Sequence, residues 1–194
     1  MKSIQFNPTA SETPNFHNII VTITASEFLT KELAEKIALA QWNNSNLASN
    51  IISFVHDYKI KTDCFSVIAE NQNGNVIGRL FCIQNDNNSK LWYYGDLFVI
   101  PEYRRMHIAQ RMLETAIEII KDKGGNVLRC YVEPENQASL NLQKKFSFEQ
   151  KPYQNFLDLI NDGRLMFEKK FLPFHSENAE RDEKLLTNIK EDNL

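Results

Sequence analysis

A strand–helix–strand unit constrains the fold of this chain more than any other feature. Residues 91–100 form an apolar run that predicts a strand, and Pro101 ends it because proline interrupts a ladder of hydrogen bonds. Residues 104–123 carry apolar side chains at helical spacing, and Gly124 suits the position just after a helix. Val127–Val132 predicts a second strand. Because a helix crosses between them, the two strands are expected to be parallel neighbours in one sheet.

The flanking segments predict a mixed sheet around this parallel pair. Short β-branched or alternating runs predict further strands at residues 18–23, 65–70, 76–83 and 164–171. Apolar spacing predicts helices at residues 28–43 with Ser26 as N-cap, 47–56 and 136–145. An Asn-Gly turn joins the second and third of those strands into an antiparallel hairpin. The expected fold class is α/β (α+β mixed), a mostly antiparallel sheet with a central parallel strand pair, flanked by helices.

The chain is long enough for one sizeable domain, which we expect at residues 17–173. Residues 1–16 show little periodicity and are expected to be a flexible lead. Residues 174–194 are expected to be a charged, disordered tail. Within it, residues 176–194 hold six acidic and three basic side chains, which account for the whole formal net charge of -3.

Composition and charge argue against several classes of partner and site. A net charge of -3 without a basic stripe gives no support for nucleic-acid binding. No apolar run approaches the roughly 20 residues that cross a bilayer, so no membrane partner and a cytoplasmic location are expected. The cysteines lack paired spacing and the histidines are scattered, so neither a disulfide framework nor a metal site is expected. The three cysteines are Cys64, Cys82 and Cys130.

Two motifs between residues 95 and 148 carry the functional information. The first consists of Val99, Pro101, Arg104 and Ala109, and the second of Asn136, Ser139, Leu142, Lys145 and Phe148. In both, the chain resembles the GNAT superfamily of acyl-CoA-dependent N-acyltransferases. That family has a strand ending in V-x-P-x-x-R, a helix entered through R/Q-x-x-G-x-G/A, and a later N-x-x-A/S-x-x-L-Y-x-K-x-G-F helix. Two motifs at the right separation are more specific than either alone.

The resemblance implies an N-acetyltransferase that uses acetyl-CoA as co-substrate. An amine of a small molecule or a protein would attack the thioester directly, without a covalent enzyme intermediate. The identity of the acceptor is left open, as is whether the protein forms a dimer. The alternative is a catalytically weak or inactive GNAT-fold module that binds a coenzyme or a partner protein.

A helix N-terminus is the expected coenzyme site. We expect the helix to begin near Arg104, where unpaired amides and the helix dipole together attract anions. The resemblance implies that this end cradles the pyrophosphate, and that amides of residues 97–99 polarise the thioester carbonyl. The expected cofactor-binding residues are Leu97, Phe98, Val99, Arg104, Arg105, Met106, His107, Ile108, Ala109, Asn136 and Gln143.

Three positions depart from the family pattern. His107 replaces the first motif glycine, and Ser147 replaces the turn glycine after the second helix. Gln143 stands where the family often has a tyrosine, which commonly protonates the departing thiolate. An amide cannot supply that proton. Because a thiol has a pKa near about 8.5, thiolate departure would be slower but not forbidden.

Catalysis also needs a group that accepts a proton from the amine, whose pKa is about 10.4. Asp96 and Glu133 are the candidates for this proton acceptor. Gln143 is the third candidate catalytic residue, at the position of the family's tyrosine. The alternative for each carboxylate is a solvated group at a strand end, which is the commoner case for such a residue taken alone. Tyr93, Tyr94 and Tyr131 are expected to line an acceptor groove or to pack in the core.

Overall fold

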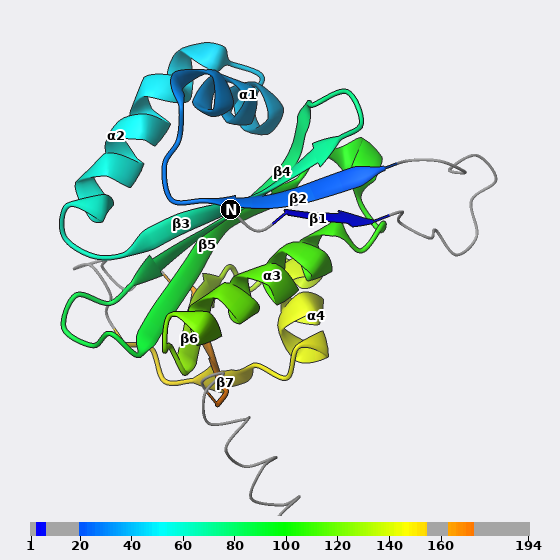
Figure 1. Cartoon of the computed structure of the whole chain (residues 1–194). Helices are drawn as coiled ribbons and strands as arrows, with labels where there is room; N and C mark the ends of the chain where they lie inside the picture. The colour runs from blue at the N-terminus through cyan, green and yellow to red at the C-terminus, as the bar shows by residue number, and fades with distance from the viewer. Residues whose placement is uncertain (1–2, 7–19, 155–162, 173–194) are drawn as a thin grey trace, which may run out of the picture.

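An eight-stranded sheet organises the molecule, with helices on both of its faces (Figure 1). The computed structural model describes residues 3–6, 20–154 and 163–172. The strand order is β1-β2-β3-β4-β5-β6-β8-β7, and only the β5–β6 pair is parallel. The strands are β1 (Ser3–Phe6), β2 (Val21–Ser26), β3 (Cys64–Asn71), β4 (Val76–Gln84), β5 (Leu91–Val99), β6 (Val127–Val132), β7 (Glu149–Lys151) and β8 (Leu165–Lys170).

The helices divide between the two faces of the sheet. Helices α1 and α2 cover one face, and α3 and α4 lie on the other (Figure 1). The α-helices are α1 (Lys31–Trp42), α2 (Ala48–Lys59), α3 (Ile108–Asp122) and α4 (Gln137–Lys145), and the 3-10 turns are η1 (Ser45–Leu47) and η2 (Pro101–Tyr103). No helix among the described residues is long and apolar enough to cross a membrane.

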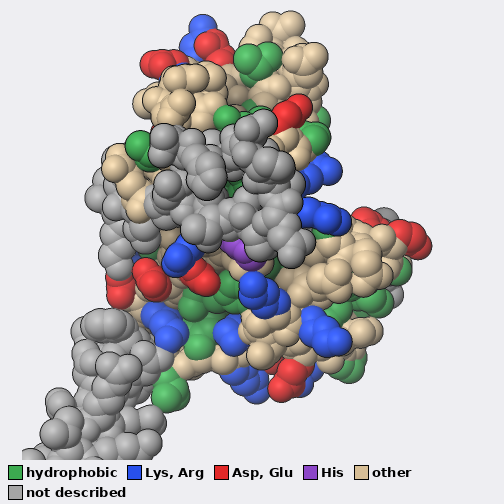
Figure 2. All heavy atoms as spheres, turned by 90° about the vertical axis from the view of Figure 1, so that its right-hand side faces the viewer, with side chains coloured by type: hydrophobic (Ala, Val, Ile, Leu, Met, Phe, Trp, Pro, Cys, Tyr) green, Lys and Arg blue, Asp and Glu red, His purple; other side chains and the backbone are tan. Residues whose placement is uncertain are grey.

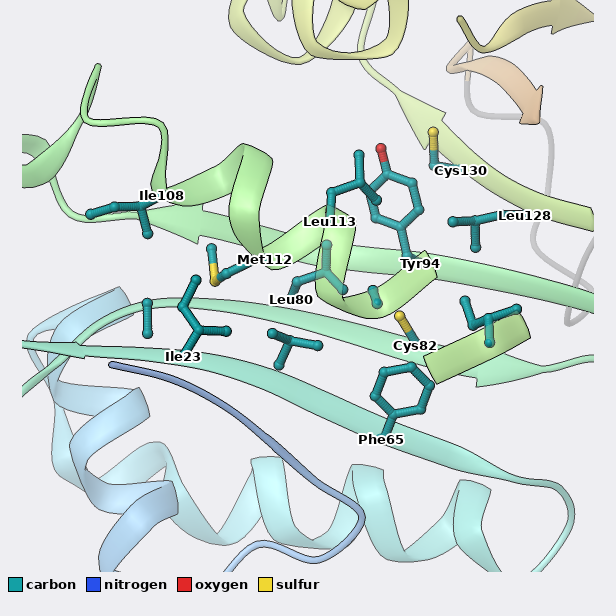
Figure 3. Close-up of a cluster of buried hydrophobic side chains, with 14 of the residues drawn as sticks. Ile23, Phe65, Leu80, Cys82, Tyr94, Ile108, Met112, Leu113, Leu128 and Cys130 are labelled. Atoms are coloured by element: carbon teal, nitrogen blue, oxygen red, sulfur yellow. The ribbon is translucent and has the colours of Figure 1, made fainter. Parts of the chain in front are cut away.

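The largest apolar core lies between α3 and the sheet. Met112 and Leu113 project from α3 onto the central strands (Figure 3), and both are fully buried. The strands contribute Ile23, Phe65, Leu80, Cys82 and Leu128 to the same cluster. Removing this apolar surface from water is the main driving force that fixes α3 against the sheet.

The predicted topology is confirmed at its centre. Strands β5 and β6 are parallel neighbours, joined from Leu91–Val127 to Tyr93–Arg129. Strands β3 and β4 form the predicted antiparallel hairpin. Helix α3 ends before Gly124, whose φ of 79° is the left-handed conformation that glycine adopts without strain.

The N-terminal part of the sequence was less well predicted. Helix α1 begins at Lys31 rather than near residue 28, and its N-cap is Thr30 rather than Ser26. The reason is that β2 continues through Ser26, which pairs with Ser66 of β3. The predicted flexible lead is wrong at Ser3–Phe6, which pairs with β2 as an additional edge strand. The rest of that lead and the predicted tail at 174–194 lie outside the described residues.

Four charged side chains connect the ends of four elements, β2, α2, β3 and α3. Lys123, just after α3, contacts Glu27 and Asp63 at 2.7 Å each. Lys59 of α2 contacts the same two carboxylates at 3.1 and 2.9 Å. Hydrogen bonds from Lys123 and Lys59 lower the pKa of Glu27. Burial alone would raise the pKa of Asp63, but the same two lysines outweigh burial and lower it.

This network predicts an acid-sensitive contribution to stability. Both carboxylates have a folded pKa below the unfolded value of about 4, so their stabilisation is present above that value and is lost as pH falls through the folded pKa. Lys123→Met should lower the free energy of unfolding by about 1 to 2 kcal/mol at neutral pH and should flatten its decline between about pH 5 and about pH 3.

Denaturant unfolding across that pH range measures both effects. Lys36→Met is the matched control, because Lys36 pairs with Glu32 at 3.2 Å on the exposed surface of α1 and should change stability by only a few tenths of a kcal/mol. Equal effects of the two substitutions at every pH would contradict a special role for the network.

Candidate functional site

Strands β5 and β6 separate part-way along their length, and this opening is the candidate site. Their pairing ends at Tyr93 and Arg129, although β5 continues to Val99 and β6 to Val132. On the other side of β5, the register with β4 shifts between Phe81–Gly95 and Arg79–Phe98. Two residues of β5 therefore face one of β4, which is a β-bulge that bends the strand.

The bulge leaves backbone donors of β5 facing the opening. The amide N–H of Ile100 donates to the Ile77 carbonyl of β4 at 2.9 Å. Because successive residues of a strand point in opposite directions, the amides of Leu97 and Val99 point away from β4. Phe98 pairs with β4 and is directed toward it. Three amides, those of residues 97–99, were predicted to polarise the thioester carbonyl. Of these, the amides of Leu97 and Val99 face the opening.

The predicted start of α3 is wrong by four residues. The helix begins at Ile108, so Arg104 and Arg105 precede it and do not occupy its first turn. Arg105 and His107 have positive φ angles of 64° and 60°, which a helix cannot accommodate. Both side chains are exposed, whereas Met106 and Ile108 are buried at 4% and 1% exposure. These two apolar side chains anchor the loop, so only their backbone can contact a ligand.

The N-terminus of α3 has the properties of an anion site. His107 is the N-cap residue, and among the described residues no side chain caps the amides of the first turn. Those amides and the helix dipole therefore favour a negative group. Lys145 of α4 donates to Gln110 Oε1 at 2.7 Å and brings a positive charge to the same turn. Lys and Arg side chains gather on the face in Figure 2, which looks onto the end of the molecule where α3 begins in Figure 1.

Arg104 is held against the end of β5. Its Nε donates to the Val99 carbonyl at 3.0 Å, so the guanidinium lies beside the strand amides. Ala109 is half-buried in the first turn of α3. The structure therefore brings together the residues from Leu97 to Ala109 that the first motif singled out. Asn136 is different, since its side-chain oxygen accepts from the Ser139 amide at 3.0 Å and caps α4.

Gln143 lies inside the protein and contacts a tyrosine of β5. It is 0% exposed, and its Oε1 accepts from the Tyr94 hydroxyl at 2.7 Å. Burial raises the pKa of Tyr94 well above its usual value. Figure 3 shows Tyr94 in the buried layer with Leu113 and Cys130. Sequence reasoning missed this contact because the partners are 49 positions apart and only the folded register brings them together.

Each of the two candidate carboxylates lies beside an arginine, Asp96 at the bulge within β5 and Glu133 just after β6. Asp96 Oδ2 lies 3.3 Å from Arg79 Nη1, and the Asp96 side chain is 44% exposed. Glu133 Oε1 lies 4.0 Å from Arg164 Nε, and the Glu133 side chain is 61% exposed. Sequence reasoning missed Arg79, because its position in an apolar strand does not reveal which face of the sheet it occupies.

The expected aromatic groove is largely core. Tyr93 is 5% exposed and stacks on Tyr131 with ring centroids 6.3 Å apart. Burial, the largest cause, raises the pKa of Tyr131 to about 12. Tyr131 also donates to the Gln154 carbonyl at 2.6 Å. These hydroxyls and rings support the β5–β6 junction by packing.

Known proteins share this sequence pattern and this fold. The model of the Acetyltransferase (GNAT) family matches residues 29–148. An uncharacterised N-acetyltransferase of Methanocaldococcus jannaschii is 28% identical over 83 residues, which are 41% of this chain and 37% of that protein. The match therefore spans well under half of the relative's length.

Solved structures extend the comparison to the whole sheet. A GNAT-family acetyltransferase from Staphylococcus aureus Mu50 has a TM-score of 0.58 at 16% identity, covering 76% of this chain and 98% of its own. PaiA N-acetyltransferase from Thermoplasma acidophilum, in complex with coenzyme A, has a TM-score of 0.59 at 18% identity, covering 77% and 99%. At these identities the likeness establishes the fold alone.

The buried Tyr94–Gln143 contact predicts a coupled effect on stability. Gln143→Leu should lower the free energy of unfolding by about 1 to 3 kcal/mol, because the Tyr94 hydroxyl would stay buried without its acceptor. The same substitution should cost much less in a Tyr94→Phe background, where no hydroxyl needs a partner. Denaturant unfolding of the four proteins of this double-mutant cycle measures the coupling. An identical cost in both backgrounds would show that the hydrogen bond contributes nothing.

Proposed function

The chain belongs to the GNAT acetyltransferase family, and from this we propose that it transfers an acetyl group from acetyl-CoA to an amine of a small molecule or a protein. One observation carries the proposal: the N-terminus of α3, which no side chain caps among the described residues, and the amides of β5 that point away from β4 lie at the same opening. The first suits the phosphates of a coenzyme, and the second suits a thioester carbonyl.

The residues present fit such a coenzyme. The amides of the first turn of α3 would hold the phosphates, with Arg104 and Arg105 adding positive charge at its edge. The amide N–H groups of Leu97 and Val99 would donate hydrogen bonds to the thioester carbonyl oxygen. Bound acetyl-CoA supplies an activated acetyl group as a thioester. The coenzyme A in the Thermoplasma acidophilum structure, which has the same fold, supports this choice of coenzyme.

The chemistry requires few side chains. The amine nitrogen forms a bond to the carbonyl carbon, the carbon–sulfur bond breaks, and the amine proton passes to a base while the sulfur leaves as thiolate. Leu97 and Val99 would stabilise the negative charge that develops on the carbonyl oxygen. Asp96 and Glu133 are exposed carboxylates that would take the proton, directly or through water. Gln143 cannot protonate the thiolate, whose conjugate acid has a pKa of about 8.5 and which therefore leaves without such help.

A second candidate function is a GNAT-fold module that binds a coenzyme or partner protein with little or no catalysis. One observation favours it. Gln143, at the position where the family often has a phenol, is fully buried, and it accepts a hydrogen bond rather than presenting a proton. This candidate shares coenzyme binding with the enzyme and differs from it only in turnover.

The extent of the domain is also a proposal. We place it at residues 17–173 together with β1 (Ser3–Phe6), because β1 extends the sheet.

Coenzyme binding should depend more on Arg104 than on Arg105. Arg104→Ala removes a guanidinium fixed against β5, and a lost charge-assisted contact of about 1.5 to 3 kcal/mol corresponds to roughly a 10- to 100-fold weaker affinity for acetyl-CoA. Arg105→Ala should weaken binding only a few-fold. Isothermal titration measures both, and Arg111→Ala on the exposed side of α3 is the control. Equal losses for the three variants would mean that general positive charge accounts for binding.

Turnover is tested by thiol release. Acetyl-CoA and a panel of amines, including amino acids, polyamines, aminoglycosides and peptides with free N-termini or lysines, should yield coenzyme A thiol with at least one acceptor. Mass spectrometry should find that acceptor heavier by one acetyl group. A protein that binds acetyl-CoA, as shown by a rise in melting temperature, but acetylates no acceptor would support the binding module instead.

A further inference from the structure

Arg79 is a charged residue in the middle of the sheet. It lies on β4, is 1% exposed, and has its guanidinium 5.4 Å from the ring centroid of Phe81. Taking a guanidinium out of water costs several kcal/mol, and a single ion pair with a partly exposed carboxylate repays that cost poorly. Stability alone therefore does not account for this residue.

The hydrogen bonds of Arg79 form a line across three strands. Its Nε donates to Ser66 Oγ of β3 at 3.3 Å, and its Nη1 donates to Asp96 Oδ2 of β5 at 3.3 Å. Within the part of the chain that the structure describes, Nη2 has no hydrogen-bond partner. The guanidinium is thus fixed from the interior by Ser66 and aimed at Asp96.

Asp96 stands at the bulge that opens β5. Its φ of 50° is a left-handed conformation, which turns the strand at the residue just before Leu97. One carboxylate oxygen faces Arg79, and the other has no hydrogen-bond partner among the described residues. With 44% of the side chain exposed, that second oxygen is open to a ligand. The carboxylate is therefore one residue away from an amide proposed to hold the thioester carbonyl.

We propose that Asp96 binds the ammonium group of the acceptor and that Arg79 is the positioning residue that holds this carboxylate in place. The inference rests on the proposed acetyl transfer and adds the acceptor class: an amine that arrives as a cation. A carboxylate fixed on one side by a buried guanidinium keeps its orientation, so its other oxygen presents a directed hydrogen-bond acceptor to an ammonium. Arg79 acts on the reaction only through Asp96.

Asp96→Asn is the most informative variant. Asparagine keeps the size of the side chain and tolerates a positive φ, so the bulge should persist while the negative charge is lost. With the acceptor found by thiol release, kcat/KM for that acceptor should fall by about 10-fold or more, and the dissociation constant for acetyl-CoA should stay within about twofold. Arg79→Lys keeps a positive charge but loses the fork that bridges Ser66 and Asp96, and should give a similar loss for the acceptor.

The double variant separates positioning from a general structural effect. If Arg79 acts through Asp96, adding Arg79→Lys to Asp96→Asn should lower kcat/KM no further. Arg129→Lys is the matched control, because Arg129 pairs with Glu168 at 2.7 Å in another partly buried ion pair. It should shift the melting temperature and leave the acceptor's kcat/KM within about twofold. If Arg79→Lys does not fold, Asp96→Asn at the exposed end of the pair still decides the matter.

Three results would overturn the inference: an acceptor kcat/KM within twofold of wild type for Asp96→Asn, additive losses in the double variant, or an equal loss of acetyl-CoA affinity. The proposed function itself fails if the wild-type protein acetylates no amine, and that result would rule out both acetyl transfer and the role of Asp96. If the wild-type protein turns over and the Asp96 and Arg79 variants keep its kcat/KM for the acceptor, only this inference is ruled out.

Discussion

The short parallel ladder between β5 and β6 is the constraint on which the rest of the site depends. Three residue pairs hold the strands together, and beyond Tyr93 and Arg129 they part. The chain leaves β5 at this open end and soon enters α3, so the strand amides and the helix N-terminus share one location. Burial of the apolar face of α3 fixes both relative to the sheet. The site follows from connectivity and packing.

Backbone strain is concentrated at this end of the molecule. Asp96, Arg105 and His107 all adopt positive φ, a conformation that costs a non-glycine residue about 1 kcal/mol or more. Buried neighbours hold the two loop residues in place, since Met106 and Ile108 anchor the chain between and after them. The positive φ of His107 also gives a physical reason for the glycine found at that motif position. Strain held by surrounding packing is a property of binding and catalytic sites.

Features set by residues close together in the sequence were predictable, whereas contacts between residues far apart in the sequence were not. Local periodicity predicted β3 to β6, β8 and the end of α3 at Gly124, because those patterns lie within one element, but it missed the short strands β1 and β7. The start of α3 was placed too early, since apolar Met106 continues the helical spacing while the positive φ of its neighbours leaves no trace in sequence. The Tyr94–Gln143 and Arg79–Asp96 contacts join residues 49 and 17 positions apart and depend on sheet register. No local pattern reports such contacts.

The central claim is that one opening holds both the phosphates and the thioester of acetyl-CoA, and amide hydrogen exchange tests it residue by residue. With saturating acetyl-CoA, exchange should slow at Leu97 and Val99 of β5 and at the first-turn amides of α3, from Ile108 to Gln110. Phe98, directed toward β4, should change little and serves as the internal reference. Protection at both groups together is the result that the account predicts. Binding that protects neither group, or only amides on other elements, would contradict it.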